Sequence, residues 1–124
     1  MTPPRIYVSH ASGFDFKKEL YEPLGAISGV EFIFPHASAK AINSKDAIKH
    51  ADGLLAEVSM PSHGVGIEIG WAEMLGKPLI FAHRDEVKVS GALTFLKATV
   101  LSYASSAELT TKTQQALTQL TAQS

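Results

Sequence analysis

The segment Ala56–Gly70 (AEVSMPSHGVGIEIG) combines residue types that favour chemistry on an anionic ligand. It begins as a strand, turns at Pro61 and opens a helix near Val65. Gly64 and Gly66 would let the backbone approach a ligand closely. The free N–H groups at the start of a helix, together with the positive end of its dipole, favour an anion such as phosphate. The turn is therefore a candidate phosphate-binding site.

Two side chains of this segment, Ser62 and Glu68, are candidates for binding and catalysis. The Ser62 hydroxyl adds a hydrogen-bond donor to the turn. Glu68 is expected in the first turn of the helix, where the helix dipole stabilises a carboxylate by about 0.3–1 kcal/mol. An ionised carboxylate directed into a pocket suits nucleophilic attack on the C1 carbon of a sugar. Glu68 could instead only satisfy the helix end, and the residues alone leave both interpretations open.

Other ionisable residues follow or lie within the expected strands. Four of the five histidines, His10, His36, His63 and His83, are expected beyond the carboxyl ends of strands. Polar loops explain this equally well, and no pair has the spacing of metal ligands, so we expect neither a metal nor an organic cofactor. Glu57 lies among apolar neighbours and needs a partner if it is buried. That partner could be a histidine, a ligand or solvent.

The elements that must position these residues alternate along the chain. Pro23 falls inside the first expected helix and predicts a kink or an early end, and Ser44 is the expected N-cap of the second. The strands are expected at Arg5–Ser9, Val30–Phe34, Gly53–Ser59, Pro78–Ala82 and Thr99–Tyr103, and the helices at Phe14–Ile27, Ser44–His50, Gly64–Gly76, Ala92–Lys97 and Ser105–Thr121. This pattern predicts an α/β fold, a flavodoxin-like, Rossmann-type three-layer sandwich with a five-stranded parallel sheet.

The composition narrows the class of protein. The chain has 124 residues, which fits a single domain over residues 1–124, and 45% of them are hydrophobic. The net charge of −1, without clusters of Lys and Arg, argues against a nucleic-acid polymer as partner and still allows a small anionic ligand. The absence of cysteine excludes disulfides and thiolate catalysis. With no signal region and no apolar run long enough to span a bilayer, we expect a cytoplasmic protein without a membrane partner.

The stretch Ala51–Ala72 (ADGLLAEVSMPSHGVGIEIGWA) resembles the signature of the nucleoside 2-deoxyribosyltransferase superfamily, most closely its small branch of nucleoside 5′-monophosphate N-glycosidases. In that branch a strand ending in AEV precedes a PS-x-GVG-x-E-x-G turn and helix. The resemblance extends to Ile6-Tyr7 and to Lys77-Pro78, about two-thirds of the chain. It implies a Rossmann-like fold, a homodimer, a small nucleotide as ligand and cleavage of the bond between base and sugar, by hydrolysis or by transfer to a second base.

The resemblance also implies roles for individual residues. Glu68 would be the nucleophile that attacks C1′, and Tyr7 would lie beside the sugar or the nucleophile. Ser62 would hold the 5′-phosphate with backbone N–H groups of the Gly64–Gly66 turn. Ser90 would reach the phosphate in the site of a neighbouring subunit.

The chain departs from the family pattern at two positions. The family has an aspartate, which protonates the leaving base, eight residues before the Asp of its Ala-Asp pair; Ser44 stands there in this chain, and Asp46 could substitute for it. The family also has a glycine after the first strand, where the ligand packs closely, and this chain has His10. His10 could act as a replacement acid or as a ligand clamp, or it could block the pocket.

Two alternatives follow. A domain with Ser44 and His10 at these positions could bind a nucleotide without turning it over, as a sensor module. In addition, Arg5–Ser12 (RIYVSHAS), followed by Asp15, resembles the opening of a TIR domain, a family with a related α/β fold that can cleave NAD with a glutamate. That resemblance covers about 20 residues.

Overall fold

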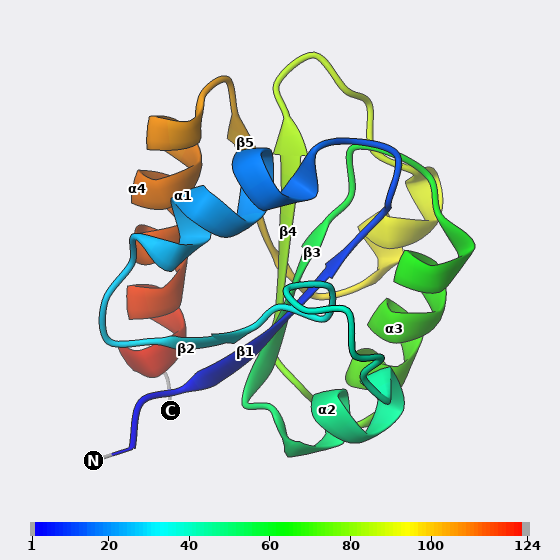
Figure 1. Cartoon of the computed structure of the whole chain (residues 1–124). Helices are drawn as coiled ribbons and strands as arrows, with labels where there is room; N and C mark the ends of the chain where they lie inside the picture. Colours follow the sequence, from blue (N-terminus) through cyan, green and yellow to red (C-terminus); the bar gives the residue numbers. More distant parts are fainter. Residues whose placement is uncertain (1, 123–124) are drawn as a thin grey trace.

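Five parallel strands form one sheet in the computed structural model, which describes residues 2–122 (Figure 1). The strands are β1 (Arg5–His10), β2 (Glu31–Ile33), β3 (Gly53–Glu57), β4 (Leu79–Arg84) and β5 (Thr99–Tyr103). Their spatial order is β2-β1-β3-β4-β5. This is the flavodoxin-like order, so the predicted fold class is confirmed.

The helices lie on both faces of the sheet, with α1 and α4 on one side and α2 and α3 on the other (Figure 1). The short η2 segment packs on the same side as α3. The bounds are η1 (Lys17–Tyr21), α1 (Glu22–Gly25), α2 (Ser44–His50), α3 (His63–Met74), η2 (Gly91–Phe95) and α4 (Ser106–Ala122).

Two apolar cores result because successive side chains of a strand point to opposite faces. On β1, Ile6 and Val8 belong to the core with α1 and α4, where Leu24 is fully buried. Tyr7, between them, belongs to the core with α2 and α3, which contains Ile69. The residues of β1 are therefore divided between the two sides of the molecule.

The first helix differs from the expected Phe14–Ile27. It begins with the π-helical η1, in which the N–H of Glu22 donates to the carbonyl of Lys17, five residues back. The α-helical part, α1, ends at Gly25. Pro23 lies in the first turn of α1 and has no N–H to donate, which agrees with a change of helical type at this point. The expected early end is observed, at Gly25.

The N-caps of α2 and α4 are Asn43 and Ser105. Ser44 is the first residue of α2 and not its cap, because Asn43 accepts the N–H of Asp46 on its side-chain oxygen at 3.2 Å. At α4, Ser105 accepts the N–H of Glu108 at 3.2 Å, and the Glu108 carboxylate accepts the N–H of Ala104 at 3.2 Å. This differs from a capping box only in that the carboxylate binds the N–H one residue before the N-cap.

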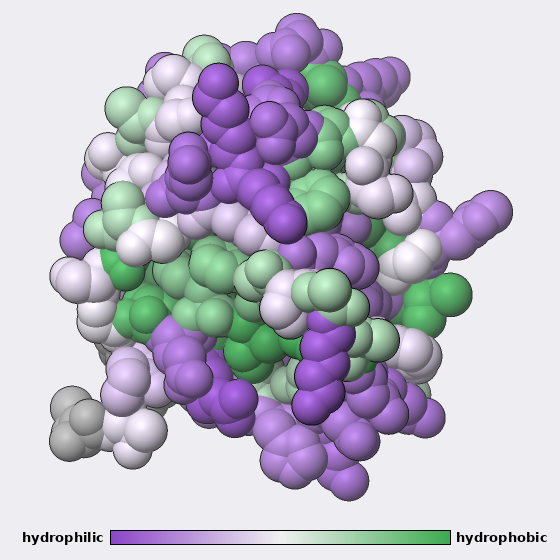
Figure 2. Space-filling view, viewed as in Figure 1, coloured by the Kyte–Doolittle hydropathy of each residue, from purple (hydrophilic) through white to green (hydrophobic). Residues whose placement is uncertain are grey.

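The surface mixes apolar and hydrophilic side chains. In the orientation of Figure 1, apolar residues occupy the middle of the face and hydrophilic ones surround them (Figure 2). The most exposed large apolar side chains are Phe95 on η2 and Met74 on α3, with 90% and 83% of their area accessible. Within residues 2–122, no helix has the length and apolar character needed to cross a membrane.

Candidate active site

Glu68 lies on the second turn of α3, and its expected place in the first turn is wrong. The helix begins at His63 with Ser62 as its N-cap, because the Ser62 hydroxyl accepts the N–H of Val65 at 3.4 Å. The expected start near Val65 was too late. Since the field of a helix dipole falls off within the first turn, other groups must hold the carboxylate.

Two hydroxyl groups of β1 hold Glu68. The Tyr7 phenol donates to Oε2 at 2.9 Å, and the Ser9 hydroxyl donates to Oε1 at 2.6 Å. Both donors are buried. Tyr7 and Ser9 are two residues apart on one strand, so they point to the same face. Sequence reasoning overlooked Ser9, and this period of two was the signal that could have found it.

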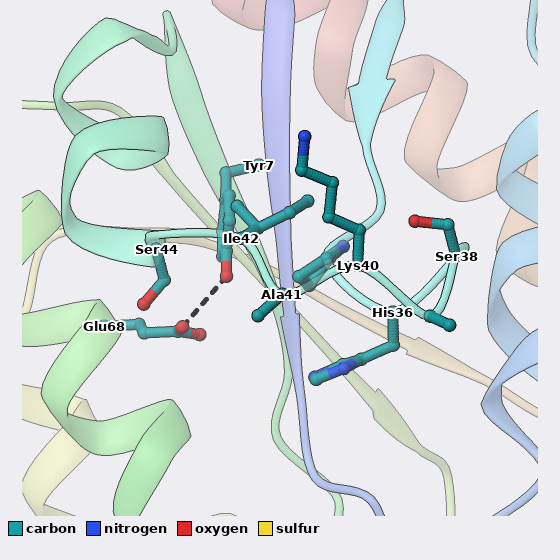
Figure 3. Close-up of a pocket in the computed structure, with 10 residues that line it drawn as sticks. Tyr7, His36, Ser38, Lys40, Ala41, Ile42, Ser44 and Glu68 are labelled. Atoms are coloured by element: carbon teal, nitrogen blue, oxygen red, sulfur yellow. Dashed lines mark hydrogen bonds between the residues drawn. The ribbon is translucent and has the colours of Figure 1, made fainter.

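Tyr7 stays protonated at this site. Burial and the neighbouring Glu68 carboxylate raise the pKa of Tyr7 well above its usual range, while a hydrogen bond from Ser44 acts in the opposite direction. The phenol therefore remains a hydrogen-bond donor to Glu68. Ser44, which stands where the resembled family has an acid, thus belongs to the same group of side chains. Figure 3 shows the hydroxyls of Tyr7 and Ser44 directed toward Glu68.

A cavity of about 310 Å³, the first cavity, opens beside this group. Its outer wall is the segment between β2 and α2, and the His36 ring extends from that wall toward Glu68 (Figure 3). The amino group of Lys40 points away from Glu68 in the same view. The complete lining is Tyr7, Pro35, His36, Ser38, Ala39, Lys40, Ala41, Ile42, Ser44 and Glu68.

A second cavity, of about 370 Å³, lies where the chain leaves β1 and enters α3. Ser62 and His63 contribute from the start of α3, and Ser12 from the loop after β1. The rest of the lining is Ala11, Gly13, Met60 and Pro61. Hydroxyl groups, an imidazole and a helix N-terminus at one cavity are suited to an anion.

Five expected site residues line neither cavity: His10, Asp46, Ser90, Gly64 and Gly66. His10 shares the α1 face of β1 with Ile6 and Val8, opposite to Glu68, because strand residues alternate. Asp46 is exposed on α2 and Ser90 is exposed before η2. His10 and Asp46 are therefore not placed to act as the acid beside Glu68.

The glycines of the turn are only partly as expected. Gly64 and Gly66 lie exposed in the first turn of α3, close to the second cavity, and a side chain at Gly66 would meet nothing within 4 Å. Gly70 is exposed, with open space where a Cβ would lie, so it faces outward from the molecule.

Glu57 is a buried carboxylate that pairs with Tyr103 and Ser59 and not with a histidine. It is 3% exposed and accepts hydrogen bonds from the Tyr103 phenol and from Ser59, whose N–H lies at 2.7 Å and whose hydroxyl lies at 2.9 Å. The Ser59 hydroxyl also accepts the N–H of Arg84 at 2.9 Å. This cluster joins the carboxyl ends of β3, β4 and β5 just before the turn that leads to Ser62.

These two cavities lie where doubly wound sheets bind ligands. The connection that follows β1 covers one face of the sheet and the connection that follows β3 covers the other, so a crevice forms at the carboxyl ends of these two strands. Tyr7 and Ser9 come from β1, and Glu68 comes from the helix that follows β3. The sheet order therefore explains why residues 61 positions apart meet.

No family model matches the chain. A sequence relative is the 5-hydroxymethyl-dUMP N-hydrolase of Rattus norvegicus, 39% identical over 67 residues. That match covers 52% of this chain and 37% of the rat protein, so it spans little more than a third of the relative's length.

In fold, the chain is similar to the solved structure of the Clostridium botulinum CMP N-glycosidase BcmB. The TM-score is 0.69 and the sequence identity is 23%, over 90% of this chain and 98% of the other. At that identity the likeness establishes a shared fold. Together with the similarity to the rat protein, it confirms the resemblance to the nucleoside 5′-monophosphate N-glycosidases that the segment Ala51–Ala72 indicated.

Proposed function

We propose that this protein cleaves the N-glycosidic bond of a nucleoside 5′-monophosphate, with Glu68 as the nucleophile. The observation that carries the proposal is the Glu68 carboxylate at the wall of the first cavity, where each of its oxygens accepts a hydrogen bond from a buried hydroxyl group. Such a carboxylate has a fixed direction, which a nucleophile needs. The names of the rat relative and the bacterial structure support the same reaction.

The two cavities suit the two ends of a nucleotide. The first cavity would take the base and the second the 5′-phosphate, with Ser62 and the first N–H groups of α3 as donors. Ser62 and Glu68 are six positions apart along the chain, about 9 Å at the rise of an α-helix. A sugar with its 5′-phosphate spans a distance of this order, so C1′ would lie at Glu68.

The reaction proceeds in two displacements. A Glu68 oxygen forms a bond to C1′ as the C1′–N bond breaks, and the electron pair of that bond stays on the base nitrogen, which takes a proton. Water then attacks C1′ and loses a proton, which releases the sugar 5-phosphate and restores the carboxylate. Two inversions at C1′ give net retention. If a second base attacks in place of water, the result is transfer.

The proton for the leaving base must come from a group at the first cavity or from water. Ser44 is a weak acid and hydrogen-bonds Tyr7. His36 is the imidazole on the facing wall, and its ring extends toward Glu68 (Figure 3). An imidazole is among the side chains most often used for general acid catalysis. We therefore assign His36, rather than His10 or Asp46, as the candidate proton donor.

The test is base release, followed by chromatography, from a panel of ribo- and deoxyribonucleoside 5′-monophosphates, with NAD included. We expect one monophosphate to react and Glu68→Gln to be slower by more than about a thousandfold. Added free base would reveal transfer through a new nucleotide. Release from NAD alone would favour the TIR-like alternative. Tight binding of a monophosphate without any base release would favour the sensor module.

We also infer a homodimer that associates through α3. Ile67 and Met74 are 52% and 83% exposed and share one side of the helix with Gly70. A glycine at this position lets a second backbone approach closely. Phe95 is exposed on η2, and Ser90 is the N-cap of this segment. The η2 segment packs on the same face of the sheet as α3. A role for Ser90 in the partner's site thus stays a prediction.

A further inference from the structure

The outer wall of the first cavity is a segment without regular structure, Pro35–Ile42. From His36 to Ile42 its residues are exposed. Near its start two backbone N–H groups are bound: Ala37 donates to the Phe34 carbonyl at 3.2 Å, and His36 donates to the Tyr21 phenol at 3.1 Å. The second bond is a tertiary contact that ties the wall to η1.

Tyr21 is well fixed for this contact. It is the last residue of the π-helical η1, and its side chain is 7% exposed. Its ring stacks on Phe34 with centroids 4.3 Å apart and lies 5.3 Å from Phe16. A π-helical turn shifts the residues after it relative to a regular helix, and such turns are frequent at functional sites. The phenol oxygen is therefore presented at a defined point behind the wall.

His10 completes the arrangement, and its proton can be assigned from its partners. Nδ1 lies 2.7 Å from the Ala11 carbonyl, which can only accept, so Nδ1 carries the hydrogen. Burial lowers the pKa of His10, so the ring is neutral and Nε2 is an acceptor. Tyr21 lies 2.6 Å from Nε2 and donates to it. The Tyr21 oxygen is then free to accept from the His36 N–H.

We propose that His10 and Tyr21 are positioning residues, which through the chain Ala11–His10–Tyr21–His36 fix the wall of the first cavity and with it the His36 side chain. This explains His10 at a position where the resembled family has glycine: it faces away from Glu68 and acts on the site through Tyr21 and through its own ring contact with His36, at 5.4 Å between centroids. The effect on substrate binding rests on the proposed function, whereas the effect on the wall does not.

The direct test is amide hydrogen exchange of the segment 35–42, resolved at His36. Tyr21→Phe keeps the stacked ring and removes only the hydroxyl. We expect exchange of the His36 amide to accelerate by about fivefold or more, the equivalent of one hydrogen bond. Tyr103→Phe is the matched control, because it removes another buried phenol, on Glu57, that has no contact with this segment. Equal His36 exchange in Tyr21→Phe and the wild type would overturn the proposal.

Two substitutions at His10 distinguish the contributions of its two ring nitrogens. The amide oxygen of His10→Gln reaches the place of Nε2 and can still accept from Tyr21, whereas the side chain of His10→Asn reaches only the place of Nδ1. We expect His36 exchange close to wild type in the glutamine variant and faster in the asparagine variant. The same rate in both variants would contradict the assigned proton positions and the role of His10.

Steady-state kinetics supply the functional part. With the monophosphate that reacts in the panel, we expect Tyr21→Phe to raise KM by about fivefold and to change kcat by less than about twofold, since Tyr7, Ser9 and Glu68 keep their contacts. Unchanged KM in an active variant would refute the link to binding. If the wild type releases no base, the proposed reaction fails, and the exchange rates still decide whether His10 and Tyr21 fix the wall.

Discussion

At the scale of single residues, the contacts of Glu68 with Tyr7 and Ser9 have a measurable consequence. Each hydrogen bond restricts the rotation of the carboxylate. Hydrogen bonds to charged groups are also stronger than those between neutral groups. We expect Tyr7→Phe and Ser9→Ala each to lower kcat by about 10- to 100-fold with little change in KM. Stopped-time chromatography of released base measures both constants.

The control for these variants is Tyr103→Phe. Its phenol is as buried as that of Tyr7 and also donates to a carboxylate, that of Glu57. We expect it to lower the free energy of unfolding without lowering kcat. Wild-type kcat in both Tyr7→Phe and Ser9→Ala would mean that the orientation of Glu68 does not limit the reaction.

His10 makes a second prediction, on stability. Burial lowers its pKa from the usual 6.5, so as the pH falls below that value the unfolded chain takes up a proton before the folded chain does. Protonation of His10 therefore does not change the free energy of unfolding above about pH 6.5. Below that pH it reduces the free energy of unfolding by up to about 1.4 kcal/mol per pH unit.

Urea unfolding at pH 7.5 and at pH 5.5 or thereabouts would measure this, with His10→Gln as reference. The ring of His36 lies 5.4 Å from that of His10, so the difference between the two pH dependences belongs to His10 together with its contact with His36. Parallel dependences would show that the pKa of His10 is close to normal.

At the scale of elements, the sequence allowed the strands and helices to be predicted better than the joints between them. Alternating apolar segments predicted all five strands of the sheet. The start of α3 was missed by one to two residues because Ser62, treated as a ligand donor, is also the N-cap. That small error placed Glu68 in the first turn of the helix instead of the second.

The contacts across the sheet were harder to anticipate. Glu57 was expected to meet a histidine, a ligand or solvent, and it meets Tyr103 on β5 instead. Likewise, His10 contacts Tyr21, which lies at the end of the π-helical η1. Local patterns do not specify which side chains meet across two strands or where a helix changes its type, since tertiary packing decides both.

Ser62 is both the N-cap of α3 and a proposed donor to the phosphate, and a substitution can separate these two roles. Ser62→Asp should preserve the cap, because aspartate is as good an N-cap as serine, and should leave stability within about 0.5 kcal/mol. Its charge would repel a phosphate in the second cavity. We expect KM for the monophosphate to rise by about 10- to 100-fold while any reaction with the free nucleoside is unaffected. An unchanged KM would place the phosphate elsewhere.

At the scale of the whole molecule, the sheet order and the uneven surface determine what a single chain can do. The order β2-β1-β3-β4-β5 creates one crevice, and both cavities lie along it. Outside the crevice, Ile67, Gly70 and Met74 form an apolar stripe on the exposed side of α3, flanked by the exposed Glu73. An exposed apolar patch marks an interaction surface, which favours a second copy as the cover.

Met74→Lys tests this cover, because it places a charge at the most exposed apolar position of α3. If two chains associate there, the wild type should have twice the 13.3 kDa of one chain in light scattering at micromolar concentration, and the variant should have the mass of one. Gln115→Lys adds the same charge on α4, on the other side of the sheet, and should leave the mass unchanged. A wild-type protein with the mass of one chain would rule out this interface. It would also mean that Ser90, which lines neither cavity of its own chain, has no part in the site.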